Sequence, residues 1–248
     1  RTGGEGSYQG IANTGYYSNG AWEIRMGREG GGTMLGGGII TAGHAEAWDH
    51  VSLTAGFDAW HHVAMVYNGA ELHFFLDGVQ EPLAAADTGN LVTVGNPLFI
   101  GQAGTGSGGE YFVGLIDEVK VFTSALSNDD VGTECSCSIT VPAPPPVLTA
   151  SGGLEAYYSF EADSALDDSG LGRDGSWEGT EAYDVGANGG GRAASFDGSS
   201  RIVVSSFAGF QWTDQLTVSL FFRRTGGEGS YQGIANTGYY SNGAWEIR

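Results

Sequence analysis

The chain has 248 residues, of which 29 are acidic and 10 basic, so its formal net charge at pH 7 is −19. This acidic excess argues against nucleic acid and anionic membrane as partners, because both repel a polyanion. The chain contains no apolar run of about 18 residues, so the sequence predicts no membrane insertion. The charge favours solubility; the alternatives are divalent-cation binding and self-repulsion that keeps a fibre extended.

The stretch 1–25, RTGGEGSYQGIANTGYYSNGAWEIR, recurs without a substitution at 224–248, an offset of 224 − 1 = 223. We call this stretch the repeated segment. A fixed internal period indicates a repeat architecture, and this period has the size of a domain. We favour a tandem array of period 223. An overlap produced when a repetitive sequence is assembled, a cloning duplication and a short duplication at both ends of one domain are the alternatives.

Short runs of aromatic and β-branched residues, separated by many of the 44 glycines, predict strands at 60–67, 71–76, 97–101 and 111–122. Asn68-Gly69 stands between the first two runs and predicts a type I′ hairpin turn, which needs positive φ at both positions. In the second run, alternation predicts two faces. One face holds Leu72, Phe74 and Leu76, and the other holds Glu71, His73 and Phe75.

Ser127 and Asp130 have the spacing of a capping box, which predicts a short helix after the last of these strands. Residues 135–152 form a linker that contains Cys135, Cys137 and four of the six prolines. Proline-rich linkers favour an extended, semi-rigid conformation. Its Ser and Thr residues are also candidate sites for O-linked glycans.

Further strands are predicted after the linker, at 154–160, 193–196, 201–204 and 216–222. Many short strands with frequent turns and almost no helical pattern favour a sandwich. The fold class that we expect is therefore all-β, a two-sheet antiparallel jelly-roll sandwich.

Several segments together resemble the laminin-G-like jelly rolls of the concanavalin A-like lectin/glucanase superfamily. In the order of that family, they are LEAYYSF, DDSGLGRDG, AASFDG, LTVSLFF, AWEIR, WHHVAMVYNGAELHFFLDG, LFIG and GLIDEVKVFTSALS. The resemblance implies a lectin-like sandwich and spans nearly the whole period.

The order of these segments is rotated in the chain. Residues 1–134 resemble the C-terminal half of one sandwich, and residues 153–248 resemble the N-terminal half of the next. Residues 1–134 alone would leave sheet edges open, so their missing strands should come from the preceding copy. If the copies were separate chains, such head-to-tail contacts would make an open filament.

Relatives of this family include glucanases, which use paired carboxylates. The nearest candidates are Asp117 and Glu118, but neighbouring strand residues should point to opposite faces and could not flank one glycosidic bond. We therefore expect no enzyme activity. The same alternation makes His61 and His62 structural residues and not a zinc pair.

Calcium is a candidate ligand, although no cofactor is our main expectation. Four acidic residues cluster in a glycine-containing loop and offer the oxygen ligands that calcium prefers. They are Glu161, Asp163, Asp167 and Asp168. The resemblance also implies acids after the LFIG strand in calcium-binding relatives, and this chain has none in Gln102–Gly106.

Aromatic residues in or near the glycine-rich loops are candidates for stacking on sugars, with core packing as the alternative. They are Tyr16, Tyr17, Trp22 and Trp48. Cys135 and Cys137 should be exposed by their context. A disulfide across one residue would be strained, so we expect them to bond to a neighbouring repeat or protomer in an oxidising compartment.

The function that we expect is structural: a repeat unit of an extracellular filament, surface appendage or large adhesin. Its partners would be neighbouring copies of itself, head to tail, at the cell surface or outside the cell. The alternative is a multivalent carbohydrate-binding module, with or without calcium.

Overall fold

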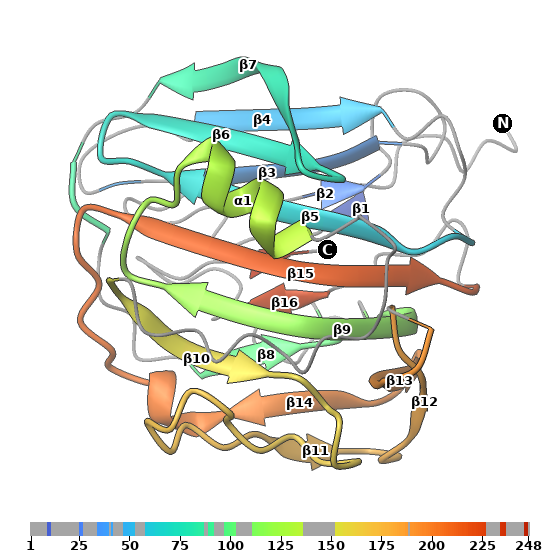
Figure 1. Ribbon diagram of the computed structural model, residues 1–248. Helices are drawn as coiled ribbons and strands as arrows, with labels where there is room; N and C mark the ends of the chain where they lie inside the picture. The colour runs from blue at the N-terminus through green and yellow to red at the C-terminus, as the bar shows by residue number, and fades with distance from the viewer. Residues whose placement is uncertain are drawn as a thin grey trace, which may run out of the picture.

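A computed structural model describes residues 9–10, 25–26, 34–39, 41, 47–52, 58–86, 89–91, 97–102, 111–135, 152–187, 189–226, 234–236 and 246–247. These residues form an antiparallel jelly-roll sandwich of two layers, as the sequence predicts (Figure 1). The part of the chain that the structure describes includes no helix long and apolar enough to cross a membrane.

Before the linker the elements are β1 Gln9–Gly10, β2 Arg25–Met26, β3 Met34–Ile39, β4 Ala47–Ser52, β5 His61–Tyr67, β6 Glu71–Leu76, β7 Val79–Ala86, β8 Leu98–Ile100, β9 Val113–Phe122 and α1 Asn128–Cys135. After it they are β10 Leu154–Tyr158, β11 Ser176–Glu178, β12 Tyr183–Val185, β13 Arg192–Asp197, β14 Arg201–Val204, the 3₁₀ turn Ser205–Phe207, β15 Leu216–Arg224, β16 Ala235–Asn236 and β17 Glu246–Ile247.

The front layer is one sheet in the order β12-β13-β9-β15-β5-β6-β7, with β10 also paired to β9. β15 lies in the middle, between β5 and β9, and pairs with both (Figure 1). β15 follows the linker in the chain, whereas β5 and β9 precede it. The two halves that the sequence assigns to neighbouring sandwiches therefore complete one sandwich within a single chain. Which halves pair in a tandem array stays a prediction.

The rear layer consists of two sheets that lie behind the front sheet in Figure 1. One has the order β1-β2-β3-β4, and the other has the order β11-β14-β8-β16-β17. Their inward side chains share one core with the front sheet: Leu35 of β3, Ile100 of β8 and Ala235 of β16 are fully buried in the same cluster as Val63 and Val218. The core therefore joins all three sheets.

The face pattern predicted for β6 is correct where the structure describes burial. Leu72 and Phe74 belong to the sandwich core, whereas Phe75 packs on the opposite face against Ala64 and Val131. Val131 belongs to α1, so the helix covers the outer face of β5 and β6 (Figure 1). The capping box is also confirmed, because the Ser127 amide donates to Asp130 and the Asp130 amide donates to Ser127 Oγ.

The type I′ turn, however, lies elsewhere than predicted. β5 ends at Tyr67 and β6 begins at Glu71, so the three residues 68–70 connect the two strands, and Asn68 does not have a positive φ. Its Oδ1 atom accepts the amides of residues 70 and 71 instead. The two-residue turn with positive φ at both positions is Asp77-Gly78, because Leu76 pairs directly with Val79.

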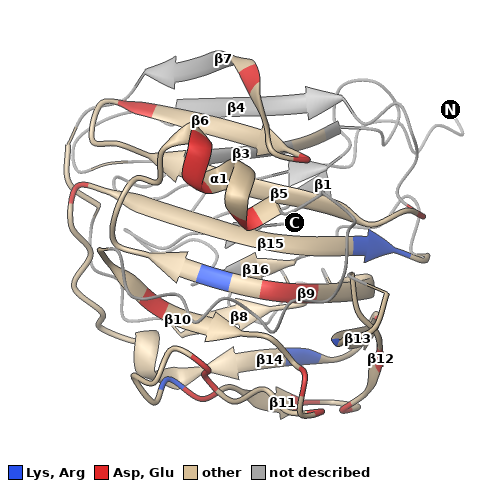
Figure 2. Cartoon of the chain, viewed as in Figure 1, with Lys and Arg blue, Asp and Glu red and all other residues tan. Residues whose placement is uncertain are grey.

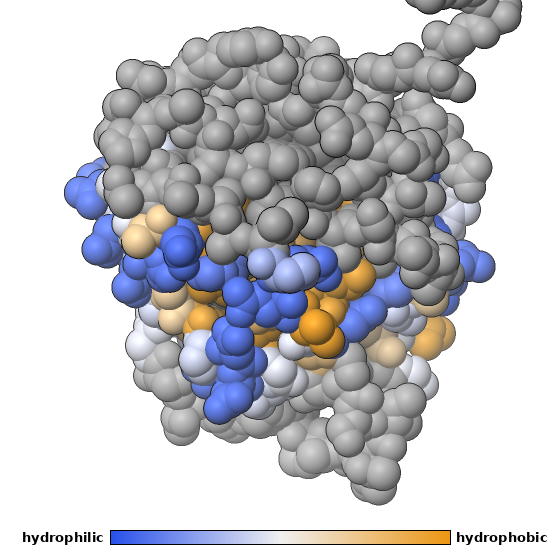
Figure 3. All heavy atoms as spheres, turned by 90° about the horizontal axis from the view of Figure 1, so that it is seen from above, coloured by the Kyte–Doolittle hydropathy of each residue, from blue (hydrophilic) through white to orange (hydrophobic). Residues whose placement is uncertain are grey.

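The described surface is acidic and mostly polar. Figure 2 shows Asp and Glu positions in red on strands, loops and the helix, with Lys and Arg positions in blue on fewer of these elements. In the view from above, hydrophilic side chains cover much of the described surface, with apolar side chains between them (Figure 3). The large exposed apolar residues among those described are Val79, Leu166, Leu171 and Val185.

Candidate functional site: a polar network on the outer face

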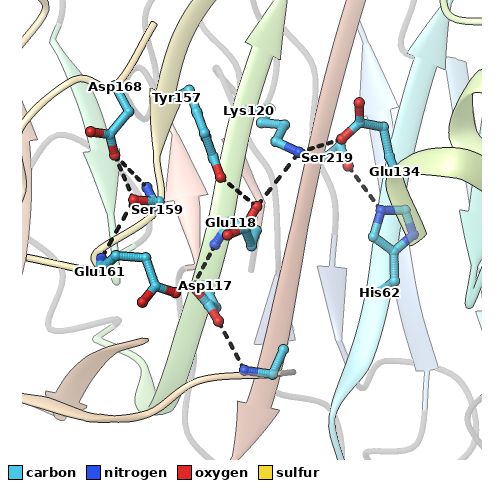
Figure 4. A network of polar contacts seen from close by, with 11 residues as sticks. His62, Asp117, Glu118, Lys120, Glu134, Tyr157, Ser159, Glu161, Asp168 and Ser219 are labelled. Atoms are coloured by element: carbon cyan, nitrogen blue, oxygen red, sulfur yellow. Dashed lines mark hydrogen bonds and ion pairs between the residues drawn. The ribbon is translucent and has the colours of Figure 1, made fainter. Parts of the chain in front are cut away.

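A β-bulge in β9 brings two consecutive acids to one face. Ile116 and Val119 both point into the core, although three positions separate them. The pairing with β15 shifts register across this stretch, and Glu118 has a φ of +53°. The extra residue leaves both Asp117 and Glu118 on the outer face, where Figure 4 shows them side by side. The prediction that they point to opposite faces is wrong for this reason.

Asp117 is buried, with 2% of its surface exposed. Its two oxygens accept the amides of Glu118 and Ala187, each at 2.8–2.9 Å. Burial raises the pKa of Asp117 to about 8, and the nearby Glu118 and Glu161 carboxylates add to the shift, whereas the Ala187 amide opposes it. Asp117 is therefore largely protonated at neutral pH.

Glycines allow a loop to close over these acids. A Cβ atom on Gly186 would lie 2.7 Å from Asp117 Oδ2, and one on Gly191 would overlap Glu161 Oε1. The Gly186 amide also donates to the Gly191 carbonyl at 2.9 Å. The loop between β12 and β13 is thus held against Asp117 by backbone contacts.

Glu118 links β9 to β10 and to the helix. Its carboxylate accepts the Tyr157 hydroxyl at 2.7 Å and lies 3.6 Å from Lys120 Nζ. Lys120 also contacts Glu134 of α1 at 2.5 Å, and its ammonium lies over the Tyr157 ring at 4.9 Å. Burial raises the pKa of Glu118 and that of Tyr157, so the hydroxyl of Tyr157 keeps its proton as a donor. One ammonium thereby joins two half-buried or buried carboxylates.

The two histidines of β5 face opposite ways, as predicted. His61 packs near the core residue Phe222 and contacts Asp77 through Nδ1 at 2.9 Å. His62 lies on the outer face, and its Nε2 atom is 2.8 Å from Ser219 Oγ. Burial, together with the charge of Lys120, lowers the pKa of His62 to about 4. His62 is therefore neutral at physiological pH.

A serine beside a neutral histidine has the partners of an activated nucleophile. Here both residues are inaccessible, because His62 is 1% exposed and Ser219 is 2% exposed. Asp77 does not orient the ring of His62 either, because its second oxygen accepts the backbone amide of that residue. The pair therefore joins β5 to β15 and reaches no substrate in this arrangement.

The acidic loop predicted as a calcium site uses its carboxylates for its own backbone. Asp167 accepts the amides of Tyr157, Ser169 and Arg173. Burial alone would raise the pKa of Asp167, but these bonds outweigh it and lower the pKa. Asp168 accepts the amide and hydroxyl of Ser159.

The other two acids of the loop turn toward Arg192. Asp163 lies 2.5 Å from Arg192 Nε, and Glu161 accepts the Arg192 amide at 3.3 Å. No group of three or more His, Cys, Asp or Glu side chains suited to a metal occurs in the described part of the chain. Calcium binding stays a prediction.

The remaining predicted site residues are only partly described. Tyr16, Tyr17, Trp22 and Cys137 lie outside the described residues, and for Trp48 only its place in β4 is described. Cys135 ends α1 and is 3% exposed, so the expectation that it is exposed is wrong. The described residues include no free cysteine. The disulfide between repeats and the sugar-stacking roles stay predictions.

Taken together, the outer-face contacts join β5, β9, β10, β15 and α1 across the seam between the two halves of the chain (Figure 4). They connect segments far apart in sequence, such as His62 and Ser219, which are 157 residues apart. Sequence reasoning missed this network. The arrangement stabilises the junction of the halves, and its most buried acid is not accessible to a ligand.

The fold and this site belong to a lectin-like sandwich, and the comparison with known families agrees. The model of the Laminin_G_3 family, described as concanavalin A-like lectin/glucanases superfamily, matches residues 3–132, so the chain belongs to this family. No curated protein and no solved structure matches the chain.

Proposed function

We propose that the chain is the structural repeat unit of an extracellular filament, surface appendage or large adhesin. In this assembly, lectin-like sandwiches follow one another in tandem or head to tail. The observation that carries the proposal is the recurrence of 1–25 at 224–248, in the middle of a rotated strand order. A chain that begins each sandwich in one copy and completes it in the next needs this rotation.

The sandwich supports the proposal because neither half has a complete front sheet. β5 and β9 precede the linker, and the strands that pair with them, β10, β13 and β15, follow it. Each half therefore needs a partner half. Within this chain the other half supplies it, and in a series of copies it can come from the next copy.

Composition fits the same role. One period carries the full charge of −19, because the second copy of the repeated segment adds equal numbers of arginines and glutamates. Neighbouring sandwiches in a series of copies would repel one another and keep the series extended. The linker, with four of the six prolines, is typical of a semi-rigid spacer.

The test is to image the protein by negative stain and to measure its mass by sedimentation. We expect linear assemblies whose repeat distance matches one sandwich and its linker. Only compact monomers at every concentration, from a source gene that holds a single period, would contradict the proposal.

A multivalent carbohydrate-binding module is the second candidate, and membership in a superfamily of lectins and glucanases favours it. Sites in linked copies would multiply avidity without new contacts. Tyr16, Tyr17, Trp22 and Trp48 are the stacking candidates. A glycan array with no binder above background, probed with the multimeric protein, would contradict this candidate and leave the structural one intact.

A further inference from the structure

The helix α1 covers a small apolar cluster on the outer face of β5 and β6. Ala64 and Val66 of β5 and Phe75 of β6 are buried there together with Val131 of α1. This cluster is separate from the sandwich core on the other face of the sheet. The helix has eight residues, and so short a helix is not stable alone in water. Docking on this cluster therefore decides whether α1 is helical.

His62 lies beneath the last turn of α1. Asp77 Oδ1 accepts the His62 amide at 2.9 Å, and a Cβ atom on the next residue, Gly78, would lie 3.4 Å from Cys135 Sγ at the end of the helix. Figure 4 shows the His62 ring close to the end of α1 that carries Glu134. Only 1% of the surface of His62 is exposed. The helix therefore helps to keep this imidazole out of water.

The covered imidazole of His62 makes a hydrogen bond through one nitrogen only. Its Nε2 atom lies 2.8 Å from Ser219 Oγ, whereas its buried Nδ1 atom has no partner among the described residues. The ring of Phe221 packs against it, with ring centroids 5.0 Å apart. A protonated imidazole donates from both nitrogens. Nδ1 would then need an acceptor that no described residue supplies, and burying an unpaired charged donor is costly.

The titratable and charged side chains around His62 come from β5, the turn after β6, β9 and α1. They are His61, Asp77, Glu118, Lys120 and Glu134. The charge of Lys120 opposes a proton on His62, and the charge of Asp77 favours one. Both oxygens of Asp77 are already bonded, to the His61 ring and to the His62 amide. Cys135 is not a free thiol and does not titrate. Among the described residues, the His62 ring therefore has no carboxylate bonded to either nitrogen.

We propose that α1 is an acid-released cover on the outer face of β5 and β6. When His62 takes up a proton, the helix leaves the sheet, the ring reaches water and the apolar cluster beneath the helix is exposed. The Leu126 amide stays bonded to Thr217 Oγ1 of β15, so the chain swings out after this residue. The sandwich core lies on the other face and stays folded. The proposal does not depend on the filament, because every contact that it uses lies within one sandwich.

The direction of the effect follows from the two environments of His62. Burial lowers the pKa of the covered ring to about 4, compared with 6.5 for an imidazole in water. A proton therefore favours the released helix, and release becomes easier as the pH falls from 6.5 to about 4. The equilibrium constant for release should rise roughly 100-fold between pH 7 and pH 4 if one proton is taken up.

Hydrogen exchange on the full chain between pH 7 and pH 4 tests the proposal, with rates corrected for their intrinsic dependence on pH. We expect the amides of α1 to lose roughly 100-fold of their protection by pH 4, while those of β15 keep theirs. A dye that fluoresces on apolar surfaces should bind as α1 loses protection. Unchanged protection of α1 would overturn the proposal. Equal losses in α1 and β15 would also overturn it, because the whole sandwich would then be opening.

Two matched variants separate His62 from the ion pair that holds the same end of the helix. His62→Gln keeps a hydrogen-bonding group beside Ser219 but takes up no proton, so the pH dependence of α1 protection should largely disappear. Glu134→Gln weakens the contact with Lys120 at every pH, so it should lower the protection of α1 at pH 7 and keep the pH dependence. The reverse pattern would assign the release to the ion pair and overturn the proposal.

A third variant keeps the test independent of any substitution at His62. Val131→Ala weakens the docking of α1 and leaves the imidazole in place. The helix should then be released by fewer protonated molecules, so dye binding should begin at a higher pH than in the wild type. Dye binding that begins at the same pH in both proteins would contradict the link between the proton and the helix.

Discussion

Asp117 and Glu118 follow one another in β9, yet both carboxylates lie on the outer face of the sheet and have different partners. Asp117 accepts two backbone amides and is buried, whereas Glu118 accepts a phenol and lies beside an ammonium. The bulge in β9 places both carboxylates on this face. The stability of the protein should therefore depend on pH through the buried Asp117.

The first prediction concerns the stability of the protein above pH 6.5. Asp117 has a pKa raised by burial to about 8, compared with 3.8 when unfolded. The contribution of the Asp117 carboxyl to the free energy of unfolding is fully present below pH 3.8, its pKa in the unfolded chain. This contribution is lost as the pH rises to about 8, with a slope of at most about 1.4 kcal/mol per pH unit. We expect wild-type stability to fall between about pH 6.5 and 8, and Asp117→Asn to flatten this fall. Urea unfolding at several pH values measures it; equal slopes for the two proteins would contradict the assignment.

The second prediction concerns the acid side. Burial lowers the pKa of His62 to about 4, compared with 6.5 in the unfolded chain. The contribution of neutral His62 to the free energy of unfolding is therefore fully present above pH 6.5 and is lost as the pH falls to about 4. Between pH 6.5 and 4, the raised pKa of Asp117 makes the protein more stable as the pH falls, and this gain masks the loss from His62. In the Asp117→Asn background, stability should therefore fall clearly below pH 6.5, and adding His62→Gln should reduce that fall. If stability fell equally below pH 6.5 with and without His62, the lowered pKa of His62 would be contradicted.

The third prediction concerns the ammonium that joins the sheet to the helix. Lys120→Met leaves the carboxylates of Glu118 and Glu134 without their shared cation, and breaking such a buried pair costs about 3–5 kcal/mol. The matched control is Arg192→Met, which removes an exposed partner from Asp163 and should lower the melting temperature much less than Lys120→Met does. Thermal denaturation compares them. Equal small losses would show that the network does not stabilise the junction.

The fourth prediction separates steric overlap from backbone strain. Gly101 and Gly209 both have positive φ, +85° and +79°. A Cβ on Gly101 would overlap the Phe196 ring, whereas one on Gly209 meets nothing within 4 Å. Gly209→Ala should lose free energy of unfolding through backbone strain alone. Gly101→Ala should lose roughly 1–3 kcal/mol more, which is the usual range for overpacking. Chemical denaturation of both variants is the measurement, and similar losses would argue against close packing at Gly101.

The fifth prediction concerns calcium. Because Asp167 and Asp168 already accept amides of Tyr157, Ser159 and Arg173 and the hydroxyl of Ser159, we expect the same melting temperature in excess calcium and in excess chelator. A calcium-dependent rise would show that the loop rearranges to release these oxygens. In that case Asp167→Asn should abolish the rise.

The sandwich could be predicted from sequence because its strands alternate regularly. The run 71–76 places its core side chains at every second position, and the structure places Leu72 and Phe74 in the core. The bulge in β9 also leaves a signal in the sequence: Ile116 and Val119 are three positions apart in an otherwise alternating strand. An extra residue is needed to keep both in the core.

Other features could not be predicted in this way. β3 has the sequence MLGGGI, whose glycines give no alternation of side chains to read. The contact of His62 with Ser219 depends on the register of β15 beside β5, which tertiary pairing sets and local pattern does not. Cys135 is buried by packing at the end of α1, although its neighbours in sequence are polar.

The central place of β15 has a mechanical consequence. Its backbone is bonded to β5 on one side and to β9 on the other, over most of its length. A pulling force along this strand would load both ladders in shear, because their hydrogen bonds lie across the direction of pull. They would have to rupture together and not one after another. In a filament, the sandwich would thus resist stretch most strongly at the strand that leads into the repeated segment.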